Sequence, residues 1–252
     1  MRLSRAATLA GFRLDHRAMI ASTNDIALAQ ARAGDPGRLW VVADEQSGGR
    51  GRLGRAWRSP PGNLYASVLL IDPCPPARAA ELGFVAGCAL GAALGPALRE
   101  AGHASLKWPN DLLIDGAKCA GLLLEAARLP DGRLACVAGF GVNCASHPAE
   151  LPYRATNLAA ARARPCDPAS VFEALADELI AALALWRVDG FAAIRAAWLA
   201  RAHAPGAPLR VTQGGVTREG RFKTIDARGR LVLQTNENDI FIDAGDVLSP
   251  AS

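Results

Sequence analysis

The segment of residues 46–58 constrains the fold of this chain more than any other. It holds four glycines and four arginines, contains no acidic residue, and follows an apolar run at 39–43 that predicts a buried strand. The pattern Gly49-x-Gly51-x-x-Gly54 matches the dinucleotide fingerprint, but that fold needs a helix to begin at the loop and hold the pyrophosphate. Two prolines and a glycine at 60–62 leave no room for one. The segment therefore predicts a loop and argues against a dinucleotide-binding fold.

The same loop indicates an anion-binding site. Glycine lets the backbone approach a ligand closely, and guanidinium groups offer planar donors to phosphate and carboxylate oxygens. The chain carries a net charge of +4, which equals the charge of the loop arginines Arg50, Arg52, Arg55 and Arg58. The rest of the chain is balanced, so a small anionic ligand fits better than a nucleic-acid surface. The alternative is a solvated surface loop.

Composition places the chain among globular proteins. Its 252 residues suffice for one large core and a small second domain. No apolar run reaches the length of a membrane span, and the first residues make a poor signal peptide. The six cysteines form no C-x-x-C pair and no metal spacing with the four histidines. They indicate buried thiols in a reducing, cytoplasmic compartment, with no zinc site and no disulfide framework.

The pattern of elements predicts an α+β fold. We expect helices at 22–33, 78–101, 169–186 and 191–202, and strands at 39–43, 64–71, 105–107, 112–114, 119–126 and 134–142. Hairpin turns between strands favour a mixed sheet over a doubly wound one. A linker at 203–208 precedes short strands only, which predicts a small β-barrel. The predicted domains are 1–204 and 205–252.

Three further motifs are ordinary when taken singly. Residues 106–111 read Leu-Lys-Trp-Pro-Asn-Asp, 117–125 place a lysine before an apolar strand, and 139–143 read Gly-Phe-Gly-Val-Asn. A surface lysine, a turn and two core strands would explain them. In this order, together with Ser-Thr-Asn at 22–24 and the arginine loop, they make a chain that resembles the biotin protein ligases over residues 22–248. Lipoate ligases share that superfamily's fold but not the full arginine-loop pattern.

The resemblance implies roles for particular residues. The residues implied to bind biotin are Ser22, Thr23, Asn24, Gln46, Arg50, Gly51, Arg52, Lys107 and Gly121. Those implied to bind ATP are Gly49, Arg50, Arg52, Arg55, Trp57, Lys107, Asn110, Lys118 and Asn143. Arg52 and Lys107 are the implied catalytic residues. No metal ligand is predicted, because Mg²⁺ would be held mainly by phosphate oxygens.

The resemblance also implies a reaction and partners. Biotin and Mg-ATP would give biotinoyl-5′-AMP, and a lysine of the biotin carboxyl carrier protein would take the acyl group. The C-terminal barrel would be SH3-like. Only 21 residues precede Ser22, fewer than a winged helix needs, so we expect the ligase-only type with no DNA partner. The alternatives are a lipoate ligase and a non-enzymatic biotin-binding or regulatory protein, although binding alone would not need the phosphate-facing cations.

Overall fold

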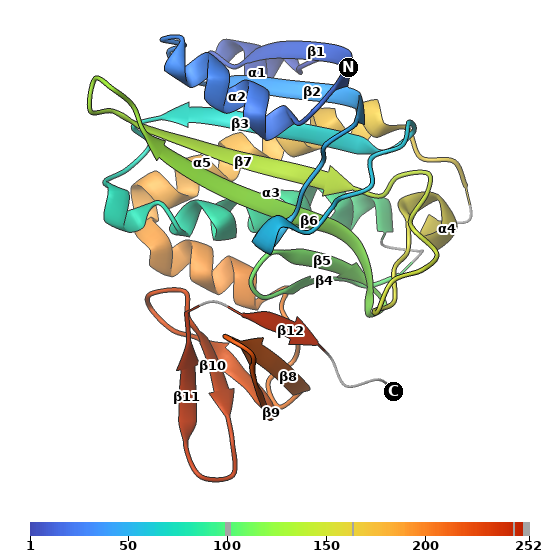
Figure 1. Cartoon of the computed structure of the whole chain (residues 1–252), viewed down its shortest axis with the longest axis vertical. Helices are drawn as coiled ribbons and strands as arrows, with labels where there is room; N and C mark the ends of the chain where they lie inside the picture. Colours follow the sequence, from blue (N-terminus) through green and yellow to red (C-terminus); the bar gives the residue numbers. More distant parts are fainter. Residues whose placement is uncertain (99–101, 163, 244, 249–252) are drawn as a thin grey trace.

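The computed structural model describes residues 1–252 except 99–101, 163, 244 and 249–252, and contains a large mixed sheet and a small antiparallel one (Figure 1). The strands of the large sheet are β1 (Arg13–Ile20), β2 (Leu39–Gln46), β3 (Leu64–Ile71), β4 (Ala104–Lys107), β5 (Asp111–Ile114), β6 (Ala117–Arg128) and β7 (Leu134–Val142). Their order is β1-β2-β3-β7-β6-β5-β4. Only β1 and β2 pair in parallel, so the predicted α+β fold with a mixed sheet is confirmed.

Helices cover both faces of this sheet because its central strands are apolar on both faces. On β2, Trp40 and Val42 face the cluster formed with α3 (Glu81–Leu98) and α5 (Pro168–Leu199). Leu39 and Val41 face α2 (Thr23–Arg32) on the other side. The Trp40 ring lies edge-on to Phe172 of α5, with centroids 5.3 Å apart. In Figure 1, α3 and α5 accordingly lie behind the sheet and α2 in front of it.

Most predicted elements are present, with altered bounds. The helix expected at 78–101 is a short 3₁₀ turn (Pro76–Arg78) followed by α3, and residues 99–101 lie outside the described residues. The two helices expected at 169–186 and 191–202 form α5, which breaks at Gly190, where φ is 73°.

Three elements escaped the sequence analysis. Strand β1 alternates polar and half-buried residues at the edge of the sheet, so it lacks the apolar run of a central strand. Helices α1 (Arg5–Leu9) and α4 (Leu158–Arg162) are too short to show a helical period.

The predicted C-terminal β-domain is confirmed as a separate sheet. Its strands are β8 (Pro208–Gln213), β9 (Val216–Ile225), β10 (Leu231–Gln234), β11 (Asp239–Ile242) and β12 (Asp246–Leu248), in the antiparallel order β11-β10-β9-β8-β12. The hydrogen bonds that join it to the large domain include one from Trp108 Nε1 to the Gly229 carbonyl at 2.9 Å and one from Arg195 Nε to the Ile225 carbonyl at 2.6 Å. The boundary at 204/205 stays a prediction. None of the described helices is long and apolar enough to cross a membrane.

A partly buried histidine in the linker makes stability depend on pH. The His203 ring packs against Phe222, and its Nε2 is buried with no hydrogen-bond partner among the described residues. Burial, and then the charge of Lys107, lower the pKa of His203 below 6.5. The unfolded chain therefore binds more protons than the folded one between the two pKa values, and stability falls as the pH drops through about 6.5.

We expect the His203→Phe variant to lose less unfolding free energy than the parent between pH 7 and pH 5.5, as measured by urea unfolding across that range. The exposed His103, changed to Phe, serves as the control and should keep the parent's slope. If the unfolding free energy of H203F changed with pH as steeply as that of the parent, another titrating group would account for the pH dependence.

Candidate functional site

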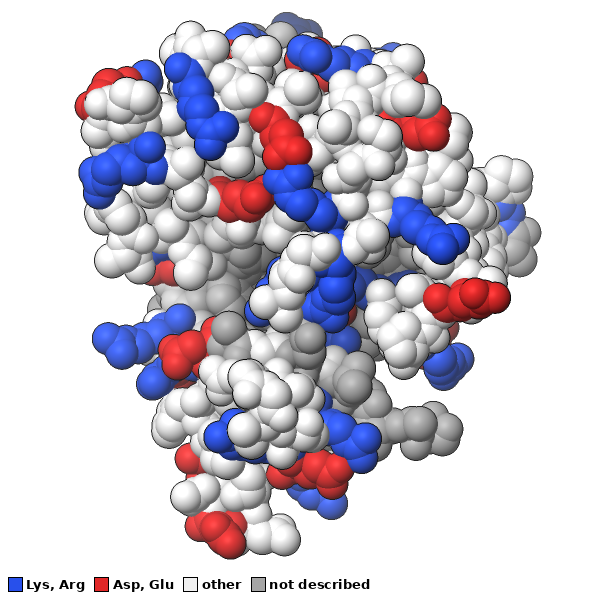
Figure 2. Space-filling model, viewed as in Figure 1, with Lys and Arg blue, Asp and Glu red and all other residues white. Residues whose placement is uncertain are grey.

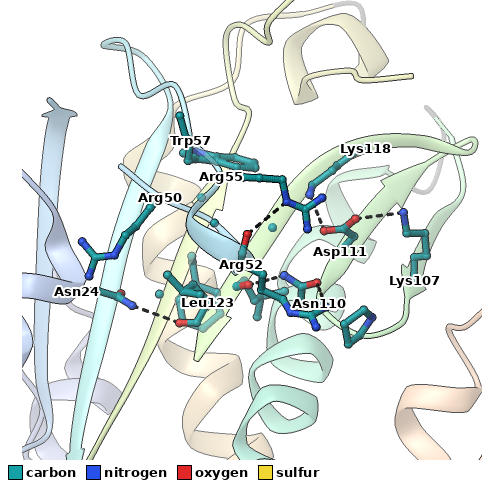
Figure 3. Close-up of a pocket in the computed structure, with 18 of the residues that line it drawn as sticks. Asn24, Arg50, Arg52, Arg55, Trp57, Lys107, Asn110, Asp111, Lys118 and Leu123 are labelled. Carbon is teal, nitrogen blue, oxygen red and sulfur yellow. Dashed lines mark hydrogen bonds and ion pairs between the residues drawn. The ribbon is translucent and has the colours of Figure 1, made fainter. Parts of the chain in front are cut away.

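A cleft of about 1000 Å³, counted with its open mouth, lies where the arginine loop crosses β6 and β7 and faces the C-terminal sheet (Figure 3). Lys and Arg side chains gather at the centre of this face of the molecule (Figure 2). The predicted site residues that line the cleft are Ser22, Thr23, Asn24, Gln46, Arg50, Gly51, Arg52, Arg55, Trp57, Lys107, Asn110, Lys118 and Gly121. The structure therefore brings together segments as far apart as α2, the loop and the β5–β6 hairpin.

The start of α2 forms a polar end of the cleft. Ser22 caps the helix, with its Oγ accepting from the Asp25 N–H at 3.4 Å. The Thr23 N–H and hydroxyl both donate to Gln46 Oε1, at 2.8 and 3.1 Å, and Gln46 Nε2 donates to Ser59 Oγ at 3.0 Å. Ser22 thus both caps α2 and lines the cleft. Thr23 and Ser59 fix the orientation of the Gln46 amide.

Asn24 is held from three sides by residues that the sequence analysis did not assign to the site. Its Nδ2 donates to Glu125 Oε2 at 2.6 Å, and its Oδ1 accepts from the Ser67 hydroxyl at 2.6 Å. A Cβ at Gly139 would lie 2.2 Å from Asn24 Oδ1, so any larger residue there would displace the Asn24 side chain. The sequence signals were a serine inside an apolar strand and a glutamate at the end of another.

Arg50 is neutralised by two carboxylates, which corrects the expectation of four uncompensated loop charges. Its guanidinium donates to both Asp25 oxygens, at 2.7 and 2.5 Å, and lies 3.4 Å from Glu125. This contact lowers the pKa of Asp25 and, with Glu125, raises the pKa of Arg50. The first arginine of the loop is therefore tied to α2 and β6.

The loop folds back on itself as a narrow hairpin. The Trp57 N–H donates to the Gly49 carbonyl at 2.9 Å, and the Gly51 N–H to the Arg55 carbonyl at 2.7 Å. A Cβ at Gly49 would lie 2.6 Å from the Trp57 carbonyl. Gly49 does not itself line the cleft; its role in ATP binding stays a prediction.

Arg52 reaches from the loop to the other side of the cleft. Its Nη1 donates to the Gly245 carbonyl at 3.3 Å and lies 3.5 Å from Asn110 Oδ1. Gly245 and Val247, from the C-terminal sheet, complete this wall, and the sequence analysis did not single them out.

Asp111 holds two predicted lysines together at one end of the cleft. Lys107 Nζ lies 3.2 Å and Lys118 Nζ 2.6 Å from its carboxylate oxygens (Figure 3). All three side chains are less than a fifth exposed, so the pairing operates in a medium where charges interact strongly. Asp111 belongs to a motif recognised in the sequence, but its role as a shared counter-ion was not predicted.

Trp57 lies over the glycines of β6 and β7. A Cβ at Gly141 would lie 2.5 Å from the indole ring, and one at Gly121 3.2 Å from it. Lys118 Nζ lies 5.5 Å from the ring centroids of both Trp57 and Tyr153. Trp57 Nε1 is buried against β7 and has no hydrogen-bond partner among the described residues.

Asn143 lies away from the cleft. Its side chain is 5% exposed and donates to the Thr156 carbonyl at 3.0 Å. This contact supports the segment that carries Tyr153. The predicted ATP-binding role of Asn143 stays a prediction.

The geometry suits a ligand with two chemically different ends. Buried hydroxyls and amides at the start of α2 can pair with a neutral polar head group. Lys107, Lys118 and Arg52 can stabilise negative charge at the other end. The described residues contain no group of three His, Cys, Asp or Glu side chains placed to hold a metal ion.

Comparison with known proteins gives consistent matches. The pattern of the Biotin/lipoate A/B protein ligase family matches residues 17–143, and that of the Biotin protein ligase C terminal domain matches 206–248. The biotin--[acetyl-CoA-carboxylase] ligase of Paracoccus denitrificans is 39% identical over 235 residues, covering 90% of this chain and 96% of its own. The ligase of the same name from Mycobacterium tuberculosis is 32% identical, covering 93% and 88%. The biotin protein ligase from Aquifex aeolicus in complex with biotin and ATP has the same fold, with a TM-score of 0.77, 24% identity and coverage of 94% and 97%.

The ion pairs of Arg50 predict how the loop responds to trypsin. We expect Asp25→Asn to raise the rate of cleavage within the loop several-fold, because the variant loses a bidentate charged contact and the loop opens more often. Time-resolved digestion followed by mass spectrometry measures this rate. Asp131→Asn, which removes an exposed pair with Arg133, is the matched control and should leave the rate unchanged. Equal rates in all three proteins would contradict the anchoring role of Asp25.

Proposed function

The chain belongs to the biotin protein ligase family, and from that premise we propose how its cleft works. It activates biotin with ATP as biotinoyl-5′-AMP and transfers the biotinoyl group to a lysine of the carrier protein of acetyl-CoA carboxylase. One observation carries this assignment: a buried neutral polar end and a cluster of cations occupy the same cleft, and biotin has a ureido ring at one end and a carboxylate at the other.

The ureido ring is recognised at the start of α2. Its carbonyl and two N–H groups need one set of donors and one of acceptors, which the Ser22 and Thr23 hydroxyls and the Gln46 amide supply. Asn24 is already held by Ser67 and Glu125, so it offers a fixed amide edge. A site that pairs these groups rejects an acid that lacks them by a large factor. This chemistry favours biotin over lipoate, whose dithiolane ring has no such donors.

Catalysis is electrostatic. When the biotin carboxylate attacks the α-phosphorus, negative charge moves between oxygens, and preorganised cations stabilise it. Lys107 and Arg52 are the catalytic residues that we propose, and no enzyme nucleophile is needed. Asp111 keeps the ammonium groups of Lys107 and Lys118 in place before the phosphates arrive. The arginine loop, by covering the mixed anhydride, protects it from water.

We assign the nucleotide end to the remaining predicted residues. Lys118 and Arg55 face the phosphates, Trp57 offers its ring to the base or ribose, and Asn110 orients Arg52. Gly49 and Asn143 do not line the cleft. Gly49 shapes the arginine loop, and Asn143 supports the segment that carries Tyr153. Asp111 alone among the lining residues is a carboxylate, which fits an Mg²⁺ ion that arrives on the phosphates and needs few protein ligands.

The assignment also includes the kind of anionic partner and the cellular compartment. The cations gather in a cleft instead of forming a stripe, which supports a nucleotide over duplex DNA as the anionic partner. The free thiols of Cys74, Cys88, Cys119, Cys136, Cys144 and Cys166 support a reducing, cytoplasmic compartment.

The proposed function is tested by pyrophosphate release from ATP with biotin or lipoate, with and without a biotin carrier domain. We expect a biotin-dependent single turnover without the carrier and continuous turnover with it. Values of kcat/KM for the two acids within tenfold of each other would replace the assignment by a lipoate ligase. Tight biotin binding without pyrophosphate release would identify a non-enzymatic biotin-binding protein.

Two neighbouring glycines allow the two ends of the cleft to be perturbed separately. Gly139→Ala must displace Asn24, and Gly141→Ala must displace Trp57. We expect the first variant to raise KM for biotin at least tenfold with little change for ATP, and the second to do the reverse. Steady-state kinetics with each substrate varied in turn measures the split. Both variants alter β7, so an equal effect on both substrates in each would show a general distortion of the strand.

Lys107→Ala should slow adenylation by about 10²-fold, since it removes a cation whose contact strengthens as charge moves to the phosphate. Biotin affinity, measured by calorimetry, should fall much less than kcat. Lys223→Ala, which removes an exposed ion pair of the C-terminal sheet, is the control. A drop in biotin affinity that matched the whole loss of kcat/KM would make Lys107 a ground-state binder only.

A further inference from the structure

A buried serine outside the cleft touches two residues of its polar end. Ser67 is on β3, has no exposed surface and does not line the cleft. Its Oγ lies 2.6 Å from Thr23 Oγ1 and 2.6 Å from Asn24 Oδ1. A serine hydroxyl has one hydrogen, so Ser67 can donate to only one of these two oxygens.

The orientation of the Asn24 amide decides which oxygen receives the Ser67 hydrogen. Asn24 Nδ2 lies 2.6 Å from Glu125 Oε2 and 3.4 Å from the Leu123 carbonyl, which are both acceptors. A flipped amide would place its oxygen against these two acceptors, and lone pairs would face lone pairs. Asn24 Oδ1 therefore faces Ser67 and can only accept, so the Ser67 hydrogen is committed to Asn24.

The Gln46 amide is fixed in a similar way. Its Nε2 donates to Ser59 Oγ at 3.0 Å, and the Ser59 hydroxyl donates to the Trp57 carbonyl at 3.0 Å. Gln46 Oε1 therefore faces the Thr23 hydroxyl, 3.1 Å away, and can only accept. Thr23 Oγ1 thus lies between two oxygens, those of Gln46 and Ser67, and neither has a hydrogen to give it.

This network is one hydrogen short. The oxygen contacts Gln46–Thr23, Thr23–Ser67 and Ser67–Asn24 share the hydrogens of the two hydroxyl groups. If Thr23 donates to Gln46, its contact with Ser67 has no hydrogen, and if it donates to Ser67, its contact with Gln46 has none. Two buried oxygens in contact without a hydrogen between them destabilise the site. An N–H that a ligand brings to Gln46 Oε1 supplies what is missing and lets Thr23 donate to Ser67.

The neighbouring hydroxyl has the opposite polarity. Ser22 Oγ accepts from the Asp25 N–H at 3.4 Å, and its own hydrogen meets no acceptor among the described residues. Ser22 therefore presents a donor at the same end of the cleft as the acceptor Gln46 Oε1. A carbonyl next to an N–H, as in a cyclic urea, can pair with both.

We propose that Ser67 is a positioning residue that makes the polar end of the cleft select ligands with an N–H group. When a ligand N–H reaches Gln46, Ser67 accepts the Thr23 hydrogen, and every contact of the network contains one hydrogen. A ligand with an oxygen in place of the N–H leaves contacts without a hydrogen. The inference rests on the proposed function, because the ureido N–H of biotin is the group that completes the network.

The test compares biotin with its cyclic carbamate analogues, in which an oxygen of similar size replaces one or the other ring N–H. Calorimetry with the full-length protein gives Kd for each acid. We expect the parent to bind the weaker carbamate about 10²-fold less tightly than biotin. Ser67→Ala should lower this ratio about tenfold, because the Thr23 hydrogen can then turn to the ring oxygen. A purely structural effect of S67A would weaken both acids alike and leave the ratio unchanged.

Further variants separate the role of Ser67 from a general effect on the sheet. The double variant Thr23→Val with Ser67→Ala should give the same ratio as Thr23→Val alone, since Ser67 acts through Thr23. Ser170→Ala removes an exposed hydroxyl on α5, outside the cleft, and should keep the parent's ratio. If S67A fails to unfold cooperatively, Ser67→Cys replaces it. The thiol is a weaker donor and acceptor, so the ratio should fall in the same direction.

Two outcomes would overturn this inference alone. They are an S67A ratio equal to the parent's, and a double variant whose ratio differs from that of Thr23→Val. Absence of biotin binding by the parent would refute the proposed function, and this inference with it.

Discussion

The need to keep several cations close together before any ligand binds is the constraint on which this cleft depends. Like charges at such distances repel strongly where water is scarce. The chain meets this need with carboxylates at two places: Asp111 between Lys107 and Lys118, and Asp25 with Glu125 around Arg50. Each set holds its cations in a defined geometry. An anionic ligand then meets groups that are already charged and oriented, which is how electrostatic catalysis avoids reorganisation during a reaction.

The two carboxylate sets differ in what they fix. Asp111 joins residues of one hairpin region and fixes the cationic end of the cleft. Glu125 connects Arg50 of the loop to Asn24 of α2, so the position of the loop and the shape of the polar end share one residue. Filling the polar end can therefore affect the position of the loop. The bond from Arg52 to Gly245 extends the same loop to the C-terminal sheet. Three parts of the chain thus meet at one glycine-rich loop.

The parts of this arrangement that sequence predicts are local. The arginine loop, the cap at 22–24 and the lysine before Trp108 are runs of neighbouring residues, and their patterns indicate turns, caps and exposed cations directly. The counter-ions are not local: Arg50 meets Glu125 across 75 positions, and Asn24 meets Ser67 across 43. Strand β1 was missed for a related reason, since an edge strand is defined by its partner more than by its own apolar residues. Pairings set by the packed sheet leave no periodic signal.

Glycines on β6 and β7 show how the packed sheet adds what local patterns lack. In the sequence, Gly121, Gly139 and Gly141 are ordinary breaks in apolar strands. In the structure they are the floor on which Asn24 and Trp57 lie, because a Cβ at either β7 position would overlap those side chains. The strands have no side chain to pack at these points. A glycine in a strand interior lowers the free energy of unfolding by about 0.5–1 kcal/mol relative to alanine. In return the sheet comes within contact distance of both ends of the ligand cleft.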